Sequence, residues 1–461
     1  MKGLGTEMKM YKETQSVDKY LNVKFECDCG RSHYAPIKKI NIGKGALNSL
    51  PEYIKEFGYS SPYIICDKIT YEIAAKKCEN LLVDAGFKPY TLILRHMCFD
   101  EATLGEIVLN KPDNCDLMIG VGTGSITDML RFSSFKLGLP CFTVATGAPM
   151  DGFSASVGIM NVNNLKATMS AHSTEVIIGD TDILKGAPFR MTVAGFADLV
   201  AKLNSLNDWC LDRVVNNSHF CDNIYRLVVD YVDDILSKSD KIKDRNPEAI
   251  GDIMNGLLLT GAVISLYGTS RPISGAEHHM SHYWEVCGEQ QGRQFAMHGE
   301  QVAVGTVLTL RFAELLRNEI LDFEKARIKA KAFNYKDWEK EILRAYGNAA
   351  DAIIDLEAKS GKNETTNVLN RIDVIESRWS EIKSLLDGLY PSEKLRSLLS
   401  ELGCPCDPKE IGITADILKN TFLYAKDTRA VYEIYQLAFD LGVLDKLSNS
   451  MIEDLISEGR L

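Results

Sequence analysis

Long apolar runs are missing from this 461-residue sequence, and their absence excludes several classes of protein. No uninterrupted apolar run reaches about 18 residues, the length that a transmembrane helix requires. Residues 1–23 contain no apolar h-region of the kind that a secretory signal carries. The composition, 45% apolar and 25% charged, is that of an ordinary globular protein and excludes disorder, collagen-like repeats and a coiled coil. We therefore expect a cytoplasmic protein that does not enter a membrane.

Basic residues are in deficit. The sequence holds 52 Lys and Arg against 63 Asp and Glu, which gives a formal net charge of −11 at pH 7. A protein with this charge repels nucleic acid and anionic membranes as a whole, so we expect neither as a partner. An anionic small-molecule substrate would need a local basic pocket.

The cysteines lack the spacing of a disulfide framework. Twelve are scattered along the chain, which in a protein of this length is typical of reduced thiols. Cys27 and Cys29, with His33 close behind, could in principle hold a metal ion. A zinc site usually needs four ligands and a second paired cluster, and the sequence shows no such cluster. We therefore predict a hairpin turn here, without a metal.

What is present is an alternation of short apolar, β-branched runs with amphipathic helical stretches. The runs are 37–42, 61–67, 90–95, 115–122, 141–145 and 174–180. This alternation is typical of βαβ units and a parallel sheet. Helical patterns lie between the runs, and Gly58, Gly86 and Gly138 fit helix C-caps.

Beyond residue 190 the strand pattern disappears and long helical patterns follow. We therefore predict an α/β protein with an N-terminal Rossmann-like parallel-sheet domain, residues 1–190, followed by an all-α C-terminal domain, residues 191–461. The boundary falls near residues 184–191. The charged stretch 361–371 is interpreted as an exposed loop.

A glycine-rich turn, Gly120-Val-Gly122-Thr-Gly124-Ser125-Ile-Thr-Asp128, follows a predicted strand and opens a predicted helix. There the backbone can approach a dinucleotide pyrophosphate, and the first N–H groups of the helix can bind its oxygens. The alternative is a plain strand-to-helix turn. Asp67, at the end of another predicted strand, could accept bonds from the adenosine ribose, although an Asp in this place can equally be a helix N-cap.

Possible metal ligands gather in the helical half. They are Asp198, the run Glu277-His278-His279-Met280-Ser281-His282, and His298. His278 and His282 are four residues apart and so share one face of a helix. One carboxylate with two imidazoles and an open position suits Zn, Ni or Fe(II), ions that polarise a carbonyl oxygen. A solvated or core-satisfied histidine cluster is the alternative.

Taken together, these segments resemble the iron-containing alcohol dehydrogenase superfamily, and within it the bacterial branch of the glycerol-1-phosphate dehydrogenases. The resemblance is carried by GVGTGSITD (120–128), VATGAPMDGFSASVG (144–158), IIGDTDILKGAP (177–188), AGFADLVAK (194–202), SRPISGAEHHMSHYWE (270–285), MHGEQVAVGT (297–306) and LYAKDTR (423–429). It implies a dinucleotide-binding first domain, a metal- and substrate-binding second domain, and an active site in the cleft between them.

The resemblance also implies roles for individual residues. It matches Asp198, His278 and His298 to the metal ligands, and Asp151 and His282 to catalytic residues that face the substrate. It matches a further set to the cofactor site, namely Asp67 at the ribose, Gly122, Gly124, Ser125 and Asp128 in the pyrophosphate loop, Thr146, and Ser154, with Ser156 as the alternative to Ser154 at the nicotinamide.

Some positions depart from the family pattern. Ala145 stands where the family has Pro, and Pro149 where many members have Ser. Lys202 occupies the position at which iron-type alcohol dehydrogenases carry a further histidine ligand. Lys202 therefore favours a three-ligand site, and we expect one divalent ion, with Zn or Ni ahead of Fe.

A possible phosphate anchor favours a phosphorylated substrate. Arg271, with His279 nearby, and Arg429 could supply it, since a guanidinium binds phosphate through paired hydrogen bonds, although each arginine could instead be a surface charge. We predict reversible reduction of dihydroxyacetone phosphate to glycerol 1-phosphate with NAD(H), NADP(H) remaining open, by a homo-oligomer, most simply a dimer. Asp151 would orient a substrate hydroxyl, Asp198 would lie beside the substrate, and His282 or a water on the metal would supply the proton.

Three alternatives remain. One is a glycerol dehydrogenase-like enzyme that acts on neutral polyols. Another is a dehydroquinate-synthase-like cyclase, which regenerates its NAD within each turnover. The third is a non-catalytic binding protein in which the histidines hold a structural metal.

Overall fold

The first half of the chain is built on a sheet of six parallel strands, as predicted. In order across the sheet these are β3 (Lys39–Gly43), β10 (Val176–Asp180), β7 (Cys141–Ala145), β6 (Leu117–Gly122), β4 (Pro62–Asp67) and β5 (Tyr90–Leu94). Each strand coincides with one of the predicted runs, so the α/β fold class is confirmed. The computed structural model describes residues 21–461 apart from 97–98, 163–164 and 294.

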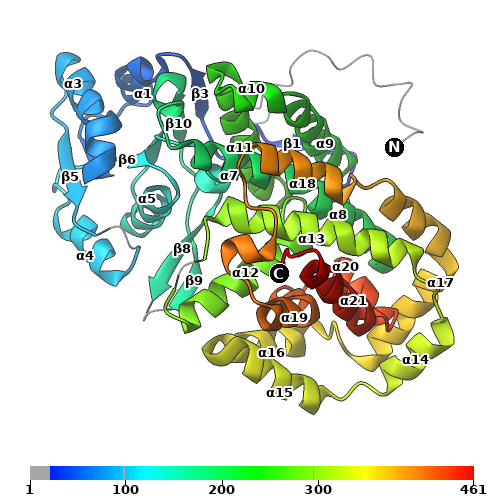
Figure 1. Cartoon of the computed structure of the whole chain (residues 1–461). Coiled ribbons are helices and arrows are strands. Elements are labelled where there is room, and N and C mark those ends of the chain that lie inside the picture. The colour runs from blue at the N-terminus through cyan, green and yellow to red at the C-terminus, as the bar shows by residue number, and fades with distance from the viewer. Residues whose placement is uncertain (1–20, 97–98, 163–164, 294) are drawn as a thin grey trace. The chain divides into compact units, whose positions relative to one another are not determined.

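Helices cover both faces of this sheet (Figure 1). They are α1 (Leu50–Glu56), α2 (Lys68–Thr70), α3 (Lys76–Asp84), α4 (Glu101–Leu109), α5 (Gly124–Leu137) and α6 (Thr181–Leu184), with the helical turns η2 (Ala46–Ser49), η3 (Tyr71–Ala75) and η4 (Gly152–Ser154). Along β4, Ile64 and Cys66 pack with α1 and α3, whereas Tyr63 and Ile65 pack with α4 and α5. Because both faces are buried, the strands are apolar throughout, which is why they could be predicted.

Glycines end three of the helical stretches, as predicted. Gly58, Gly86 and Gly138 follow α1, α3 and α5 with φ of +79°, +90° and +66°. These values lie in the left-handed region, where a side chain would be strained.

Two antiparallel hairpins accompany the sheet. The first pairs β1 (Phe25–Glu26) with β2 (Ser32–His33) and confirms the predicted hairpin turn. The second pairs β8 (Val157–Val162) with β9 (Leu165–Ser170) and was not predicted. Its sequence interrupts the apolar positions with Gly158, Asn161 and Lys166, so no regular alternation marks it.

The chain divides into two compact units, Met1–Leu199 with Asp230–Ser270, and Val200–Val229 with Arg271–Leu461. This division differs from the predicted one, in which residues 191–461 form a single helical domain. Helices α10 (Ser239–Lys243) and α11 (Pro247–Tyr267) group with the first unit because α11 packs against β3, α6 and η4. Helices α7 (Phe189–Val200) and α9 (Asp222–Ser237) each contain a boundary between the units.

Among the described residues, α11 alone is long and apolar enough to cross a membrane, judged by length and composition. Of its most apolar window, 78% is buried inside the structure, as in the core helix of a globular protein. The N-terminal segment considered above for a secretory signal, residues 1–23, lies outside the described residues up to position 20.

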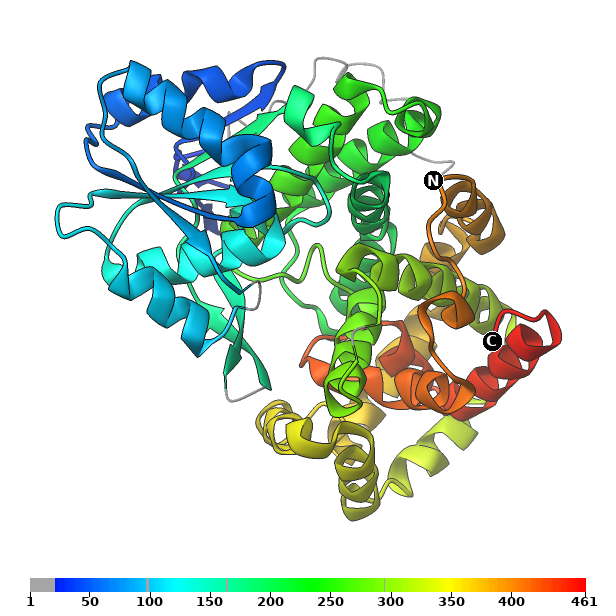
Figure 2. The same ribbon diagram turned by 60° about the vertical axis from the view of Figure 1, so that its left-hand side comes forward.

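The second unit is helical throughout its described residues, as predicted. Its helices are α8 (Lys202–Asn216), α12 (Ala276–Gln290), α13 (His298–Asn318), α14 (Phe323–Lys331), α15 (Tyr335–Tyr346), α16 (Ala350–Ser360), α17 (Thr365–Asp387), α18 (Ser392–Glu401), α19 (Ala415–Tyr424), α20 (Ile434–Asp440) and α21 (Leu444–Ser457), with the turns η5 (Gly347–Ala349), η6 (Pro408–Ile411) and η7 (Ala425–Thr428). Helices α12 and α13 lie side by side, as both views show (Figures 1 and 2). Trp284, Phe312 and Tyr435 are buried at the centre of one large apolar core.

The stretch 361–371 is not the exposed loop that its charge suggested. Gly361, Lys362 and Asn363 are buried, and α17 begins at Thr365. Lys362 is accommodated inside because its Nζ donates to the carbonyl oxygen of Arg429 at 2.8 Å and lies 3.8 Å from a carboxylate oxygen of Asp427. Partners distant in sequence compensate the charge, and the local composition does not reveal them.

The turn from β6 into α5 generates a prediction about stability. A Cβ on Gly122 would lie 2.8 Å from Cβ of Ile126, closer than packed carbon atoms approach. Gly122→Ala should therefore lower the free energy of unfolding by about 1–3 kcal/mol through overpacking, measured by urea denaturation. Gly105, inside α4 with no atom within 4 Å of its added Cβ, is the matched control. Gly105→Ala should instead stabilise by roughly 0.5–1 kcal/mol, and equal effects of the two changes would contradict this account.

Candidate active site

Three predicted cofactor residues lie along one edge of the sheet in the first unit. Asp67 ends β4, Gly122 ends β6, and Thr146 directly follows β7. The register pairs Ile65 with Gly120 and Gly122 with Ala145, so these carboxyl ends are level. β5 lies on one side of β4 and β6 on the other, so the strand order reverses here. In open α/β sheets, ligands bind at such a reversal, outside the carboxyl ends of the strands.

The glycine-rich turn brings the backbone close to the start of α5. An added Cβ on Gly124 would lie 2.8 Å from the terminal methyl of Met150. Ser125, in the first turn of α5, is exposed, and that turn contains no acidic residue. The first N–H groups of a helix have no partner within the helix, and the helix dipole favours an anion there. The predicted pyrophosphate loop thus has the local chemistry to bind an anion.

Asp128, one turn further along α5, is occupied by an internal interaction. Its Oδ1 accepts a hydrogen bond from the guanidinium of Arg131, which is buried and also donates to the carbonyl oxygen of Ala155. The bond from Arg131 to Ala155 joins α5 to the segment that follows η4, and Asp128 holds the guanidinium in place. Asp128 is therefore placed to shape the loop rather than to contact a phosphate.

Asp67 is a helix N-cap, the alternative that its position left open. Its Oδ1 accepts the N–H groups of Ile69 at 2.6 Å and Thr70 at 2.8 Å, and the hydroxyl of Thr70 accepts the N–H of Asp67. Both of these capping hydrogen bonds use the same carboxylate oxygen, Oδ1. Because a carboxylate offers about four acceptor sites, capping leaves Oδ2 able to bind a ribose hydroxyl.

Two predicted site residues meet through a backbone hydrogen bond. The N–H of Asp151 donates to Oδ2 of Asp198 at 3.0 Å, and Asp198 is fully buried in α7. Ser154, three residues after Asp151, is also fully buried, and its hydroxyl donates to the carbonyl oxygen of Leu258 in α11 at 2.9 Å. Ser154 therefore joins η4 to α11, and this position does not favour contact with a nicotinamide.

His278 is held in one orientation by its neighbour. Its Nδ1 lies 2.7 Å from Oε1 of Glu277, and the same oxygen accepts the N–H of Gly275 at 2.9 Å. Both side chains are buried, so the bond forms in a low dielectric. A carboxylate on Nδ1 fixes the tautomer in which Nε2 carries a lone pair, as is usual for a metal-binding histidine. Sequence reasoning counted Glu277 as a possible ligand, whereas here its carboxylate orients His278.

The other predicted histidines of the second unit lie close to His278. The rings of His278 and His298 are 5.5 Å apart, with ligand atoms within 4.8 Å of one another. The ring of His282 stacks on His298 at 6.4 Å. Two helices, α12 and the start of α13, thus bring all three imidazoles together.

Glu285 was missed by the sequence reasoning. Its carboxylate oxygens lie 3.6 Å from Nδ1 of His282 and 3.9 Å from Nδ1 of His298. Its three-residue spacing from His282 on α12 was the signal that could have identified it. Burial lowers the pKa of His282, while Glu285 acts in the opposite direction. His282 is therefore mostly neutral near pH 7.

The two arginines predicted to anchor phosphate have different surroundings. Arg271 is buried, with Nε 3.2 Å from Asp212 and with its guanidinium donating to the carbonyl oxygens of Asp208 and Tyr432. Arg271 thus holds three backbone segments together. Arg429 is exposed and follows η7.

Further cationic groups accompany Arg429. Lys362 and Lys426 are buried, and Nζ of Lys426 donates to Oδ1 of Asp427 at 2.8 Å. Burial lowers the pKa of Lys362 to about 8. His279 is also buried, and its Nδ1 has no hydrogen-bond partner among the described residues. Burial and the charges of Lys362 and Arg429 hold the pKa of His279 well below its usual range. This locally positive region contrasts with the net negative chain.

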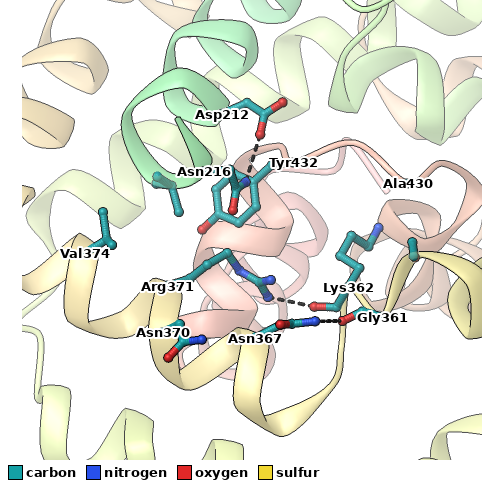
Figure 3. Close-up of a pocket in the computed structure, with 12 residues that line it drawn as sticks. Asp212, Asn216, Gly361, Lys362, Asn367, Asn370, Arg371, Val374, Ala430 and Tyr432 are labelled. Atoms are coloured by element: carbon teal, nitrogen blue, oxygen red, sulfur yellow. Dashed lines mark hydrogen bonds between the residues drawn. The ribbon is translucent and has the colours of Figure 1, made fainter. Parts of the chain in front are cut away.

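The second unit contains a polar cavity of about 490 Å³, and none of the predicted site residues lines it (Figure 3). Its charged walls are already engaged: Arg371 donates to both carboxylate oxygens of Asp440 and to the carbonyl oxygen of Lys362. The charged groups of this cavity are therefore already paired within the protein.

Comparison with known proteins gives the family. Residues 41–188 match the iron-containing alcohol dehydrogenase family. The NAD(P)+ glycerol-1-phosphate dehydrogenase of Halalkalibacterium halodurans is 31% identical over 300 residues, which cover 64% of this chain and 74% of the relative. The enzyme of the same name from Geobacillus stearothermophilus is 26% identical over 424 residues, 90% of this chain and 95% of the relative.

Solved structures agree on the fold. A glycerol dehydrogenase from Schizosaccharomyces pombe superposes with a TM-score of 0.60 at 16% identity, covering 91% of each chain. The NADH-dependent butanol dehydrogenase A of Thermotoga maritima gives a TM-score of 0.56 at 16% identity, covering 93% of this chain and 99% of the other. At 16% sequence identity, these structural matches show the fold alone. The sequence match, at 31% identity over 74% of a relative, shows that this chain belongs to the glycerol-1-phosphate dehydrogenase family of the iron-containing alcohol dehydrogenases.

Proposed function

We propose that this protein is a metal-dependent oxidoreductase that reduces dihydroxyacetone phosphate to glycerol 1-phosphate with NADH or NADPH, reversibly. The observation that carries the proposal is the hydrogen bond that Nδ1 of His278 donates to Glu277, which fixes His278 beside His298. Such an arrangement prepares imidazoles for a metal rather than for solvent. The names of the relatives, all NAD(P)+ glycerol-1-phosphate dehydrogenases, supply the substrate and the cofactor.

The proposed metal ligands are Asp198, His278 and His298. One buried carboxylate and two imidazoles suit Zn or Ni, with Fe also open. The orientation of His278 supports this set, because its Nε2 is left available. Lys202, four residues after Asp198, is buried and offers an ammonium that cannot ligate a cation, which supports three protein ligands. When bound, the ion supplies Lewis-acid polarisation of the substrate carbonyl.

The proposed dinucleotide site is the carboxyl edge of the sheet at β4 and β6. The pyrophosphate would lie on the first N–H groups of α5, at Gly122, Gly124 and Ser125, with Thr146 on the adjacent strand end. Asp67 would accept the ribose hydroxyls through Oδ2. Because Ser154 is engaged with α11, we assign the nicotinamide contact to the half-buried Ser156 instead.

Side chains of the chain would orient the substrate and move its proton. Asp151 is positioned by the bond from its N–H to Asp198, so its carboxylate could hold a substrate hydroxyl in a fixed relation to the ligand set. His282 would bind the substrate oxygen that gains a proton after hydride transfer. Since His282 is mostly neutral near pH 7, it would act by passing a proton from water, with Glu285 behind its Nδ1.

The proposed phosphate anchor is Arg429, with Arg271 as a positioning residue. Arg429 is exposed, while Lys362 and Lys426 are buried behind it, so a phosphate there would meet the guanidinium and lie in the field of these buried charges. Arg271 is instead committed to Asp212 and to two backbone carbonyls. We further propose that the protein acts in the cytoplasm as a homodimer.

The ligand assignment predicts the behaviour of His298→Ala. Loss of a ligand should remove one equivalent of bound metal and lower turnover more than about 100-fold, since changes merely behind a ligand already cost about 10–100-fold. Metal content would be measured by mass spectrometry and turnover by NADH absorbance with dihydroxyacetone phosphate. His96, which is exposed, provides the matched control, and His96→Ala should change neither quantity. Normal metal content and turnover in His298→Ala would remove His298 from the site.

Asp67→Ser separates the two roles of Asp67. Serine is also a good N-cap, so the free energy of unfolding should change little. The loss of the carboxylate should raise the KM for NADH about tenfold to 100-fold and narrow its advantage over NADPH, because a charged acceptor for the ribose is gone. Steady-state kinetics with both cofactors provides the measurement. Unchanged KM values would leave Asp67 as a cap alone.

Arg429→Ala tests the substrate. Losing a charge-assisted bond of about 1.5–3 kcal/mol should raise the KM for dihydroxyacetone phosphate about tenfold to 100-fold, while the weak activity on dihydroxyacetone or glycerol should stay constant. Arg317→Ala, on α13, is the control and should alter neither. Arg271→Ala should mainly lower stability. A wild-type protein that preferred glycerol to glycerol phosphate would support the neutral-polyol alternative instead, and one that did not consume NADH stoichiometrically would support the cyclase.

A further inference from the structure

The hairpin β1–β2 gathers three potential metal ligands within nine residues of the first unit. Cys27 follows β1, Cys29 lies in the turn and His33 ends β2. The turn is closed by Cys27 N–H donating to Arg31 O at 3.1 Å and Gly30 N–H donating to Cys27 O at 2.9 Å. The ligand atoms of Cys27, Cys29 and His33 lie within 4.8 Å of one another. None of these residues belongs to the site proposed for catalysis.

The spacing of these atoms suits a tetrahedral ion. Sγ of Cys29 lies 3.3 Å from Nε2 of His33. Zinc binds sulfur at about 2.3 Å and imidazole nitrogen at about 2.0 Å, which in a tetrahedron sets the two ligand atoms about 3.6 Å apart. The observed separation is close to this value, so an ion could be accepted with a small adjustment of two side chains.

His33 carries the second interaction that a metal-binding histidine usually has. Its Nδ1 donates to the carbonyl oxygen of Leu266, in the last turn of α11, at 2.6 Å. This bond spans 233 positions of sequence and places a lone pair on Nε2, the atom that faces Cys29. His33 is only 1% exposed, so the bond is made in the interior. A carbonyl on one ring nitrogen and a thiol at the other is the pattern of a second contact behind a zinc ligand.

We propose that Cys27, Cys29 and His33 of the first unit bind a structural zinc ion. Two thiolates and one imidazole supply three of the four ligands of such a site, and the fourth position would be open to a further ligand. This proposal is independent of the proposed function.

The hairpin has little stability of its own, so a bound metal ion would stabilise it. Each of its strands has only two residues, and a two-stranded hairpin is marginal in water even when longer. The hairpin packs on α11, which in turn packs against η4, where Ser154 is bonded to Leu258. A metal at the hairpin would therefore stabilise the N-terminal segment against the helix that supports the Asp151 segment.

The test is the Co²⁺-substituted full chain, since of the two proposed metal sites the hairpin site is the one that contains thiolates. Coordination by sulfur gives a near-ultraviolet thiolate-to-cobalt absorption that oxygen and nitrogen ligands do not give. We expect this band in the wild-type chain and in His298→Ala, which separates it from the proposed catalytic metal. Cys27→Ser with Cys29→Ser should abolish it.

Two variants at His33 distinguish the loss of a metal ligand from misfolding of the chain. His33→Cys keeps the number of protein ligands and should retain zinc with a stronger cobalt band, whereas His33→Ala should lose both. Cys210→Ser, a partly exposed cysteine on α8, is the matched control and should leave the band unchanged. Purified wild-type chain should contain zinc beyond the equivalent lost in His298→Ala. A missing cobalt band, or one that survives the Cys27 and Cys29 changes, would overturn the proposal.

Discussion

The second unit depends on one buried carboxylate, that of Asp208. Its Oδ2 accepts the N–H of Ala276 at the start of α12, and its Oδ1 accepts the N–H of Ile434 at the start of α20. Asp208 is itself part of α8, so three helices are joined at one side chain. A carboxylate that is 1% exposed is costly without such donors. Every group carried by the first turn of α12, His278 included, takes its position from this junction.

The same junction brings the buried carboxyl groups of Asp208, Glu277 and Glu433 close together. Burial, with the charges of Glu433 and Glu277, raises the pKa of Asp208 well above its usual range, and burial raises the pKa of Glu433 to about 7. The folded state therefore holds protons that the unfolded chain would release, so the stability contributed by these groups is present below pH 4–5 and is lost as the pH rises through about 7. The bond between Glu277 and His278 thus forms within a cluster of carboxyl groups that repel one another when they are charged. A metal cation bound to His278 would reduce this repulsion.

Features that depend on a local sequence pattern could be predicted from the sequence. The strands were predictable because both faces of a doubly covered sheet are apolar, as Tyr63, Ile64, Ile65 and Cys66 show. The grouping of His278, His282 and His298 was predictable because their residue type and spacing are specific. Features that depend on distant partners were not: Lys362 is buried by its contacts with the segment around Asp427, and His33 by Leu266. From the sequence alone, a charged or polar residue is predicted to be exposed, because the partner that allows its burial is not known.

Arg271 and Arg429 show why the substrate assignment needed the structure. Both are arginines beside recognisable motifs, and each fits a phosphate anchor by residue type alone. Arg271 has Asp212 and two carbonyl oxygens as partners, so removing it would leave buried acceptors without a donor. Arg429 is exposed, while its carbonyl oxygen is held by Lys362. The backbone of Arg429 is thus fixed and its guanidinium is accessible. In a chain of net charge −11, an anion is best bound where cationic groups such as Lys362 and Lys426 are buried behind an accessible one.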